Sequence, residues 1–188
     1  MEPGLVDRLR AGEERALAEA FDALGPPLCS FLARLTRSRA DAEDLVQETF
    51  VRLARCARGL APDTDLRAFL FTVARNAARS HQRWARLDAL RLLSAAHAPA
   101  QAPLTPEEWA QASQARRGLE TALGKLAFGD REALLLTAAE GLTPAQAAAA
   151  LGIEGAAFRQ RLLRARQRLA ALVGDSTKSG YAKVEEAR

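Results

Sequence analysis

The sequence has few of the residues on which β-strands, disulfide frameworks and metal sites depend. Only two of its 188 residues are Cys and one is Tyr, Val and Ile are scarce, and no segment alternates apolar and polar residues. Cys29 and Cys56 each lack a CxxC partner and a neighbouring His, so the pattern indicates neither a zinc site nor a disulfide. We interpret both as small core residues.

Long hydrophobic runs are also missing. Arg or Glu interrupts every apolar stretch well short of a membrane span, and no basic-then-apolar leader opens the sequence. We therefore expect a cytoplasmic protein without direct membrane insertion. Because 48% of the residues are apolar, the chain is globular rather than disordered.

Leu, Ala and Arg dominate instead, which favours helix almost everywhere and predicts an all-α protein. The first helix is expected from about Leu5 to Leu24, because Gly25-Pro26-Pro27 cannot continue it. A second helix is expected near Leu28–Thr36. Ser38 and Asp41 resemble a capping box that opens a helix from Arg39 to about Arg58, and a long basic helix follows Asp63 or Thr64.

The loss of helical periodicity between Leu92 and Leu104 predicts a flexible linker between two helical domains. We place the first domain at residues 1–91, the linker at 92–105, the second domain at 106–173 and a mobile polar tail at 174–188. In the second domain a helix is expected from Thr105-Pro106 to Ala127, then a turn at Gly129 and another helix after Asp130.

Positive charge is concentrated in two of these helices. The net charge is +4, yet Leu66–Arg91 carries +5, Ala156–Leu172 carries another +5, and the remaining residues carry −6. Two basic helices on an otherwise acidic chain indicate two places that hold a polyanion.

The second basic helix belongs to a predicted helix-turn-helix. Thr143 and Gln146 form a capping box for the short helix Pro144–Leu151, and Gly152 allows a tight turn. The next helix has an apolar stripe, consisting of Phe158, Leu162, Ala165, Leu169 and Leu172. Its other faces carry only arginine as a charged residue, a composition that suits the DNA major groove. The alternative is a helical hairpin whose basic face is merely solvated.

Two motifs in the correct order then indicate a family. Asp41-Ala42-Glu43-Asp44-Leu45-Val46-Gln47-Glu48-Thr49-Phe50, followed by Leu66-Arg67-Ala68-Phe69-Leu70-Phe71-Thr72-Val73-Ala74-Arg75-Asn76, resembles region 2 of the sigma-70 family. Residues 130–173 resemble region 4. The short linker is typical of the extracytoplasmic-function (ECF) class. The resemblance implies a bacterial sigma factor that directs core RNA polymerase to promoters and starts transcription by binding −35 and −10 elements.

The resemblance also assigns roles to individual residues. The acidic helix is implied to dock on the coiled coil of the polymerase β′ subunit through Asp41, Asp44, Gln47 and Glu48. Contacts to the −10 element of promoter DNA are implied for Arg75, Asn76, Arg79 and Arg83, with Asn76 beside a pocket for a flipped base. Contacts to the −35 element are implied for Arg159, Gln160, Arg161 and Arg164. An anti-sigma factor is a further implied partner.

Departures from the family pattern affect two of these helices. Ala54 stands where the family usually has Trp, and Ala157 cannot supply a hydroxyl to phosphate. Among the aromatic residues of the first basic helix, helical spacing favours core packing over base stacking for Phe69 and Trp84. Phe71 is compatible with either role.

Two rival functions are weighed against the sigma-factor interpretation. A stand-alone helix-turn-helix regulator would bind an operator without polymerase, and would need a dimer surface that the sequence does not signal. A metal-dependent enzyme would use Asp41, Glu43, Asp44 and Glu48, but all four lie on one helix and no His accompanies them. We therefore expect no catalytic residue, no metal and no cofactor.

Overall fold

The computed structural model describes the backbone of residues 4–91 and 114–185, and the side chains of residues 4–83 and 118–174. Every regular element within these ranges is helical, which confirms the all-α fold class. The chain separates into two compact units, Met1–Ala102 and Pro103–Arg188. The predicted linker, Trp84 and Trp109 lie outside the residues whose side chains are described.

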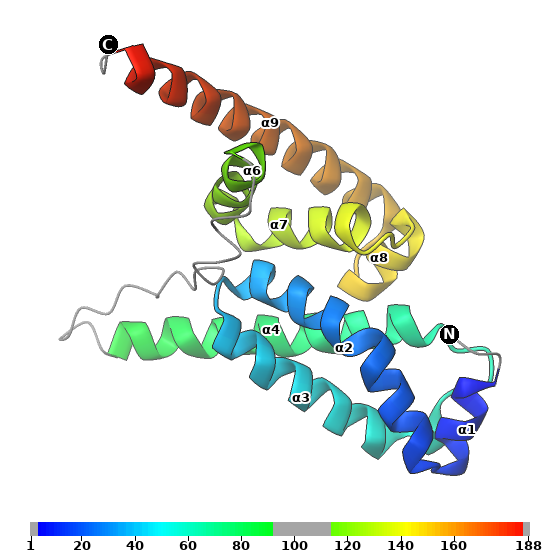
Figure 1. Cartoon of the computed structure of the whole chain (residues 1–188). Coiled ribbons are helices and arrows are strands. Elements are labelled where there is room, and N and C mark those ends of the chain that lie inside the picture. Colours follow the sequence, from blue (N-terminus) through cyan, green and yellow to red (C-terminus); the bar gives the residue numbers. More distant parts are fainter. Residues whose placement is uncertain (1–3, 92–113, 186–188) are drawn as a thin grey trace. The chain divides into compact units, whose positions relative to one another are not determined.

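The first unit is a helical bundle in which α2, α3 and α4 pack on one another, while α1 packs against η1 and the start of α2 (Figure 1). Its elements are α1 (Leu5–Ala11), α2 (Glu14–Thr36), α3 (Arg39–Cys56), the 3-10 turn η1 (Ala57–Gly59) and α4 (Leu66–Arg91). The rings of Phe31 and Phe71 meet edge-on with centroids 5.3 Å apart, and both side chains are fully buried. Phe71 is therefore a core residue.

The prediction that a helix ends before Gly25-Pro26-Pro27 is wrong, because α2 runs through this sequence to Thr36. Each interior proline costs about 3 kcal/mol of helix stability. Burial of the apolar side chains on either side of the prolines outweighs this cost, because each buried side chain contributes about 1.5–3 kcal/mol. The buried side chains are those of Leu24, Leu28, Phe31 and Leu32. Figure 1 shows that α2 bends along its length.

The actual break in the predicted first helix lies earlier, between Ala11 and Glu14. Gly12 ends α1 with φ of 82°, a left-handed conformation that glycine adopts at little cost. The N-terminus of α3 agrees with the sequence, because the Ser38 hydroxyl accepts a hydrogen bond from the Asp41 backbone N–H at 3.2 Å.

The second unit is built around its last helix, which contacts α6, α7 and α8. Its elements are α6 (Gln114–Lys125), α7 (Phe128–Leu134), the π-helical turn η2 (Leu135–Ala139), α8 (Pro144–Leu151) and α9 (Gly155–Glu185). Buried Arg131 of α7 donates hydrogen bonds to the carbonyls of Leu123, Gly124 and Leu126 at 2.8–2.9 Å. The guanidinium thus satisfies carbonyls at the end of α6 that the helix leaves without partners.

Two predictions for this unit differ from the structure. The expected turn at Gly129 is instead part of α7, which starts at Phe128. The polar segment after Val173, predicted to be a mobile tail, continues as part of α9 to Glu185. The structure contains no proline or left-handed glycine in this stretch that would end the helix.

Candidate protein and nucleic-acid interfaces

The α3 helix separates an apolar face from a polar one. The predicted inward residues are all buried, namely Ala42, Leu45, Val46, Phe50 and Leu53. Asp44, Gln47 and Glu48 are exposed on the other side, and Asp41 is half-buried. We call Asp41, Asp44, Gln47 and Glu48 the acidic surface. The structure therefore brings these four predicted residues together on one helix face.

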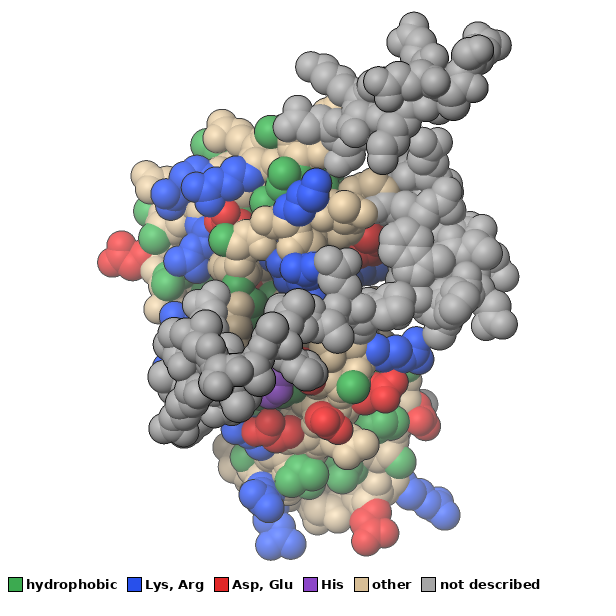
Figure 2. Space-filling model, turned by 90° about the vertical axis from the view of Figure 1, so that its left-hand side faces the viewer, with side chains coloured by type: hydrophobic (Ala, Val, Ile, Leu, Met, Phe, Trp, Pro, Cys, Tyr) green, Lys and Arg blue, Asp and Glu red, His purple; other side chains and the backbone are tan. Residues whose placement is uncertain are grey.

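The carboxylates of the acidic surface differ in their partners. Glu48 accepts a hydrogen bond from Arg52 at 2.6 Å, while Asp41 Oδ1 lies 3.9 Å from Nε2 of His81 on α4. Among the described residues, Asp44 has no hydrogen-bond or ion-pair partner. Figure 2 shows acidic side chains gathered around the histidine on this face. The negative charge of Asp44 is thus the one on this surface that no basic side chain of the described residues neutralises.

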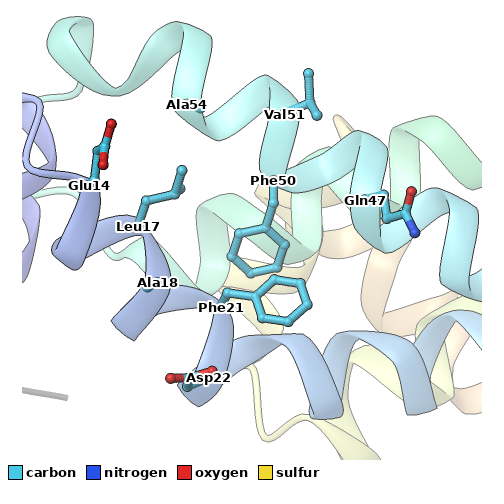
Figure 3. A pocket seen from close by; sticks show the side chains of 9 residues that line it. All are labelled: Glu14, Leu17, Ala18, Phe21, Asp22, Gln47, Phe50, Val51 and Ala54. Atoms are coloured by element: carbon cyan, nitrogen blue, oxygen red, sulfur yellow. The ribbon is translucent and has the colours of Figure 1, made fainter.

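A groove of about 570 Å³ lies between α2 and α3, next to the acidic surface. Its lining is mostly apolar and consists of Glu14, Leu17, Ala18, Phe21, Asp22, Gln47, Phe50, Val51 and Ala54 (Figure 3). The Phe21 and Phe50 rings meet edge-on with centroids 4.9 Å apart. Phe21 is 45% exposed and Val51 is 48% exposed. The groove therefore offers apolar surface to a partner, with Glu14 and Asp22 on its α2 side.

This groove was not predicted from the sequence, although α3 contains a signal for it. Gln47, Val51 and Ala54 follow one another at i, i+4 and i+7, so the face that begins with Asp44 becomes apolar at its C-terminal end. No such signal marks Phe21, because the predicted helix that contains it, Leu5–Leu24, has other bounds than α2. The small side chain of Ala54 lines the groove.

The first basic helix, α4, does not present all its predicted DNA contacts alike. Asn76, Arg79 and Arg83 are exposed and follow at i, i+3 and i+7, so they share one face. Arg75 is only 4% exposed, which does not suit a direct contact to DNA. On the inward side, Phe69 was expected in the core but is only half-buried, whereas Phe71, for which both roles were open, is fully buried.

The helix-turn-helix has the local geometry that its sequence predicts. The Thr143 hydroxyl accepts a hydrogen bond from the Gln146 N–H at 3.2 Å, and Gln146 Oε1 accepts one from the Thr143 N–H at 2.8 Å. This capping box, with Pro144 in the first turn, confirms the start of α8. Gly152 ends α8 with φ of 63°, and its N–H bonds the carbonyls of the last turn.

The α9 helix is fixed by its apolar stripe and exposes its arginines. Phe158 and Ala165 are fully buried and Leu162 is 7% exposed. Among the predicted −35 contacts, Arg159, Gln160 and Arg164 are exposed, as Arg166 also is. Arg161 is half-buried and its guanidinium lies near Gly129 of α7. Arg168 is ion-paired with Asp130. Among the described side chains of α9, the arginines most exposed to a ligand and without an acidic partner are thus Arg159, Arg164 and Arg166.

The two cysteines differ in environment. Burial raises the pKa of the Cys29 thiol, and the Glu43 carboxylate raises it further, so this thiol is a poor nucleophile at neutral pH. Cys56 is exposed, so its interpretation as a core residue is wrong. Within the described residues, no group of three or more His, Cys, Asp and Glu side chains could hold a metal ion. No helix in the described part of the chain could cross a membrane.

Comparison with known proteins agrees with this arrangement. Sigma-70 region 2 matches residues 20–87 and sigma-70 region 4 matches residues 116–169. RNA polymerase sigma factor CarQ of Myxococcus xanthus is 35% identical over 173 residues, which cover 90% of this chain and 96% of CarQ. The ECF RNA polymerase sigma factor EcfG of Rhodopseudomonas palustris is 34% identical over 148 residues, with 79% and 80% of the two chains covered.

A solved structure shows the same fold over most of the chain. The sigma factor RpoE from Bartonella quintana, crystallised with the anti-sigma factor NepR, superposes with a TM-score of 0.71 and 27% sequence identity, covering 84% of this chain and 96% of RpoE. All three similar proteins are sigma factors, which favours that function over a stand-alone regulator. The chain belongs to the sigma-70 family, in its extracytoplasmic-function class, and directs RNA polymerase to promoters.

Proposed function

We propose that this sigma factor docks on the β′ coiled coil of core RNA polymerase through the acidic surface of α3. The observation that carries this proposal is the exposed Asp44 carboxylate, which lies on the same helix face as the groove residues Val51 and Ala54. A partner helix with basic and apolar side chains would pair with the carboxylates and cover Phe21 and Val51. Charge selects the partner, and burial of the apolar lining strengthens the complex.

The two basic helices then divide the recognition of promoter DNA. Arg159, Gln160, Arg161 and Arg164 on α9 would enter the major groove of the −35 element, where arginine bonds phosphates and guanine edges. On α4, Arg79 and Arg83 would hold phosphates of the −10 element, while Asn76 contacts a base of the melted strand. We do not include the buried Arg75 among the direct contacts.

Both DNA contacts are useful only when they occur together. Each unit offers one helix to the DNA, so each contact alone is weak, and the chain joining the two raises the effective concentration of the second. The chain itself makes and breaks no bond, because initiation chemistry belongs to the polymerase. We place this activity in the cytoplasm, where the polymerase and the promoter are.

A protein inhibitor is a further proposed partner. RpoE of Bartonella quintana, which has the same fold, was crystallised with an anti-sigma factor. In this chain, a partner that covers the acidic surface or the groove would compete directly with the polymerase. The exposed apolar side chains of Phe21 and Val51 are suited to such a helix-in-groove contact.

In vitro transcription tests the proposed function. Core polymerase plus the purified chain should produce defined transcripts from a library of genomic fragments, and neither component alone should do so. The matched variant Arg159→Ala/Arg164→Ala should lose transcription from promoters with a −35 element while it still binds core. If the chain alone occupies specific duplex sites at physiological salt and core adds no transcription, the sigma-factor function is wrong and a stand-alone regulator replaces it.

A further inference from the structure

An unusual pair of neighbouring side chains lies on α4. Arg75 Nη1 donates a hydrogen bond to Asn76 Oδ1 at 2.8 Å. Consecutive helix residues point about 100° apart and do not normally face each other. Here the guanidinium is almost wholly buried at 4% exposure, whereas Asn76 is exposed. A charged group held inside the unit therefore contacts the polar side chain that faces solvent.

This contact determines which way the Asn76 amide points. Arg has only donors, so the amide oxygen, not the nitrogen, must face Nη1. The reverse orientation would place two sets of N–H donors against each other and leave the buried guanidinium nitrogen without this acceptor. The Nδ2 group is consequently directed away from Arg75. Among the described residues, Nδ2 has no hydrogen-bond acceptor.

We infer that Arg75 is a positioning residue that fixes the Asn76 amide with its N–H donors outward, so that Asn76 selects a base by a hydrogen-bond acceptor. This inference rests on the proposed contact of α4 with melted −10 DNA and adds the chemistry of that contact. A free asparagine can bond adenine through oxygen and nitrogen together. That bidentate contact needs Oδ1, which here already accepts from Arg75 with one of its two lone pairs and is held on the Arg75 side, away from the outward N–H donors. The ligand is therefore a base carbonyl or ring nitrogen without a proton.

The first test replaces only the outward group. Asn76→Asp keeps the size of the side chain and gives Arg75 an even better acceptor, so the fold should be retained. It exchanges the outward N–H donors for an oxygen. Holoenzyme is titrated with fluorescent single strands of a −10 sequence selected by the wild-type enzyme, each with one base changed. Wild type should prefer one base at one position by about tenfold or more, and Asn76→Asp should lose that preference only there.

The second test separates positioning from simple structural support. Arg75→Met and the charge-retaining Arg75→Lys should both reduce the base preference at the same position as Asn76→Asp. In a double-mutant cycle, Arg75→Met/Asn76→Ala should discriminate no less than Asn76→Ala alone, because both changes remove one interaction. Circular dichroism and core binding report whether the unit is folded. Arg79→Met serves as the matched control, since loss of a phosphate contact should weaken all strands equally.

Specific results would overturn the inference. If Asn76→Asp retains the wild-type base preference, Asn76 does not read the base as a donor. If Arg75→Met weakens binding to every strand equally and its effect adds fully to that of Asn76→Ala, Arg75 has only a structural role. Failure of wild-type holoenzyme to bind any melted −10 strand would instead contradict the proposed function itself.

Discussion

The two arginine-bearing helices, α4 and α9, hold their polar side chains in different ways. On α4, Arg75 is buried and bonded to Asn76, Arg67 lies over the Phe71 ring with its guanidinium 5.1 Å from the centroid, and Arg83 reaches Ser80. On α9, Arg159 and Arg166 extend into solvent, Arg164 Nε donates a hydrogen bond to the Gln160 carbonyl at 3.4 Å, and Arg168 is paired with an acid. On the face shown in Figure 2, several basic side chains lie at the surface of the second unit.

This difference indicates two kinds of recognition. Long exposed arginines adapt to phosphates and guanine edges of an intact duplex, and their binding is strongly reduced by salt. A fixed amide beside a few cations is better suited to a single unstacked base, whose hydrogen-bonding edge is accessible. We therefore expect α9 to supply the larger share of salt-dependent duplex binding, and α4 to supply base selection in melted DNA.

Removal of a core ring from either unit should separate the two contributions most strongly. Phe158→Ala deletes a fully buried side chain of α9 and should cost about 3–5 kcal/mol of folding free energy in the second unit. Duplex binding at the −35 element should be lost while core binding remains. Phe71→Ala is the matched change in the first unit. It should abolish core binding while duplex binding at the −35 element remains. Thermal unfolding of the full chain, together with both binding assays, measures this.

Equal loss of core binding in both variants would show that the units do not act separately. The same conclusion would follow if Phe158→Ala lowered the unfolding temperature of the first unit as much as that of the second.

The salt dependence of binding provides a sharper comparison. If Arg159 and Arg164 each contact a phosphate, their replacement by Ala should lower the slope of log affinity against log salt by about 2 for duplex DNA. Arg79→Ala/Arg83→Ala should lower the slope for single-stranded −10 DNA by about 1.4. Holoenzyme titrations at several salt concentrations give both slopes. Arg168→Ala is the control, because Arg168 is ion-paired with Asp130 and should not contribute to the slope. If Arg168→Ala lowered the duplex slope as much per arginine as Arg159→Ala/Arg164→Ala, the exposed arginines would not be distinguished from the paired one.

The smallest expected effects concern helix caps, one in each unit. Thr143→Ala removes a capping box and Ser38→Ala removes a single N-cap bond, so each should cost about 1 kcal/mol, with the larger loss at Thr143. In urea unfolding, the loss caused by Thr143→Ala should appear in the transition of the second unit. The loss caused by Ser38→Ala should appear in the transition of the first unit. A larger effect at Ser38 than at Thr143 would contradict the bonding that distinguishes the two caps.

Local signals in the sequence predicted much of the fold because they act through neighbouring residues. Two helices start where the sequence indicated, α3 at Ser38 and Asp41 and α8 at Thr143 and Gln146. The α8 helix also ends at Gly152, as predicted. The Gly25-Pro26-Pro27 prediction failed because burial across the first unit outweighs the local cost of proline. The helical continuation of α9 beyond Val173 was also missed, since a polar composition does not by itself end a helix.

The candidate site was predictable to a smaller extent. Periodicity placed the acidic surface on one face of α3, as well as Asn76, Arg79 and Arg83 on one face of α4. Spacing cannot show which arginine turns inward, so the burial of Arg75 and its bond to Asn76 required the tertiary structure. The groove also depends on the packing of α2 against α3, which brings Phe21 to Phe50 across a long sequence separation.

The most direct test of the account is co-purification of the full chain with core RNA polymerase. Wild type is compared with Asp44→Arg/Glu48→Arg, and with Asp7→Arg/Asp63→Arg, which makes the same change in charge at exposed positions outside α3. We predict that wild type and the control bind, and that reversal on the acidic surface weakens binding by about 100-fold or more. Failure of wild type to bind core, or equal binding by the Asp44→Arg/Glu48→Arg variant, would contradict the account.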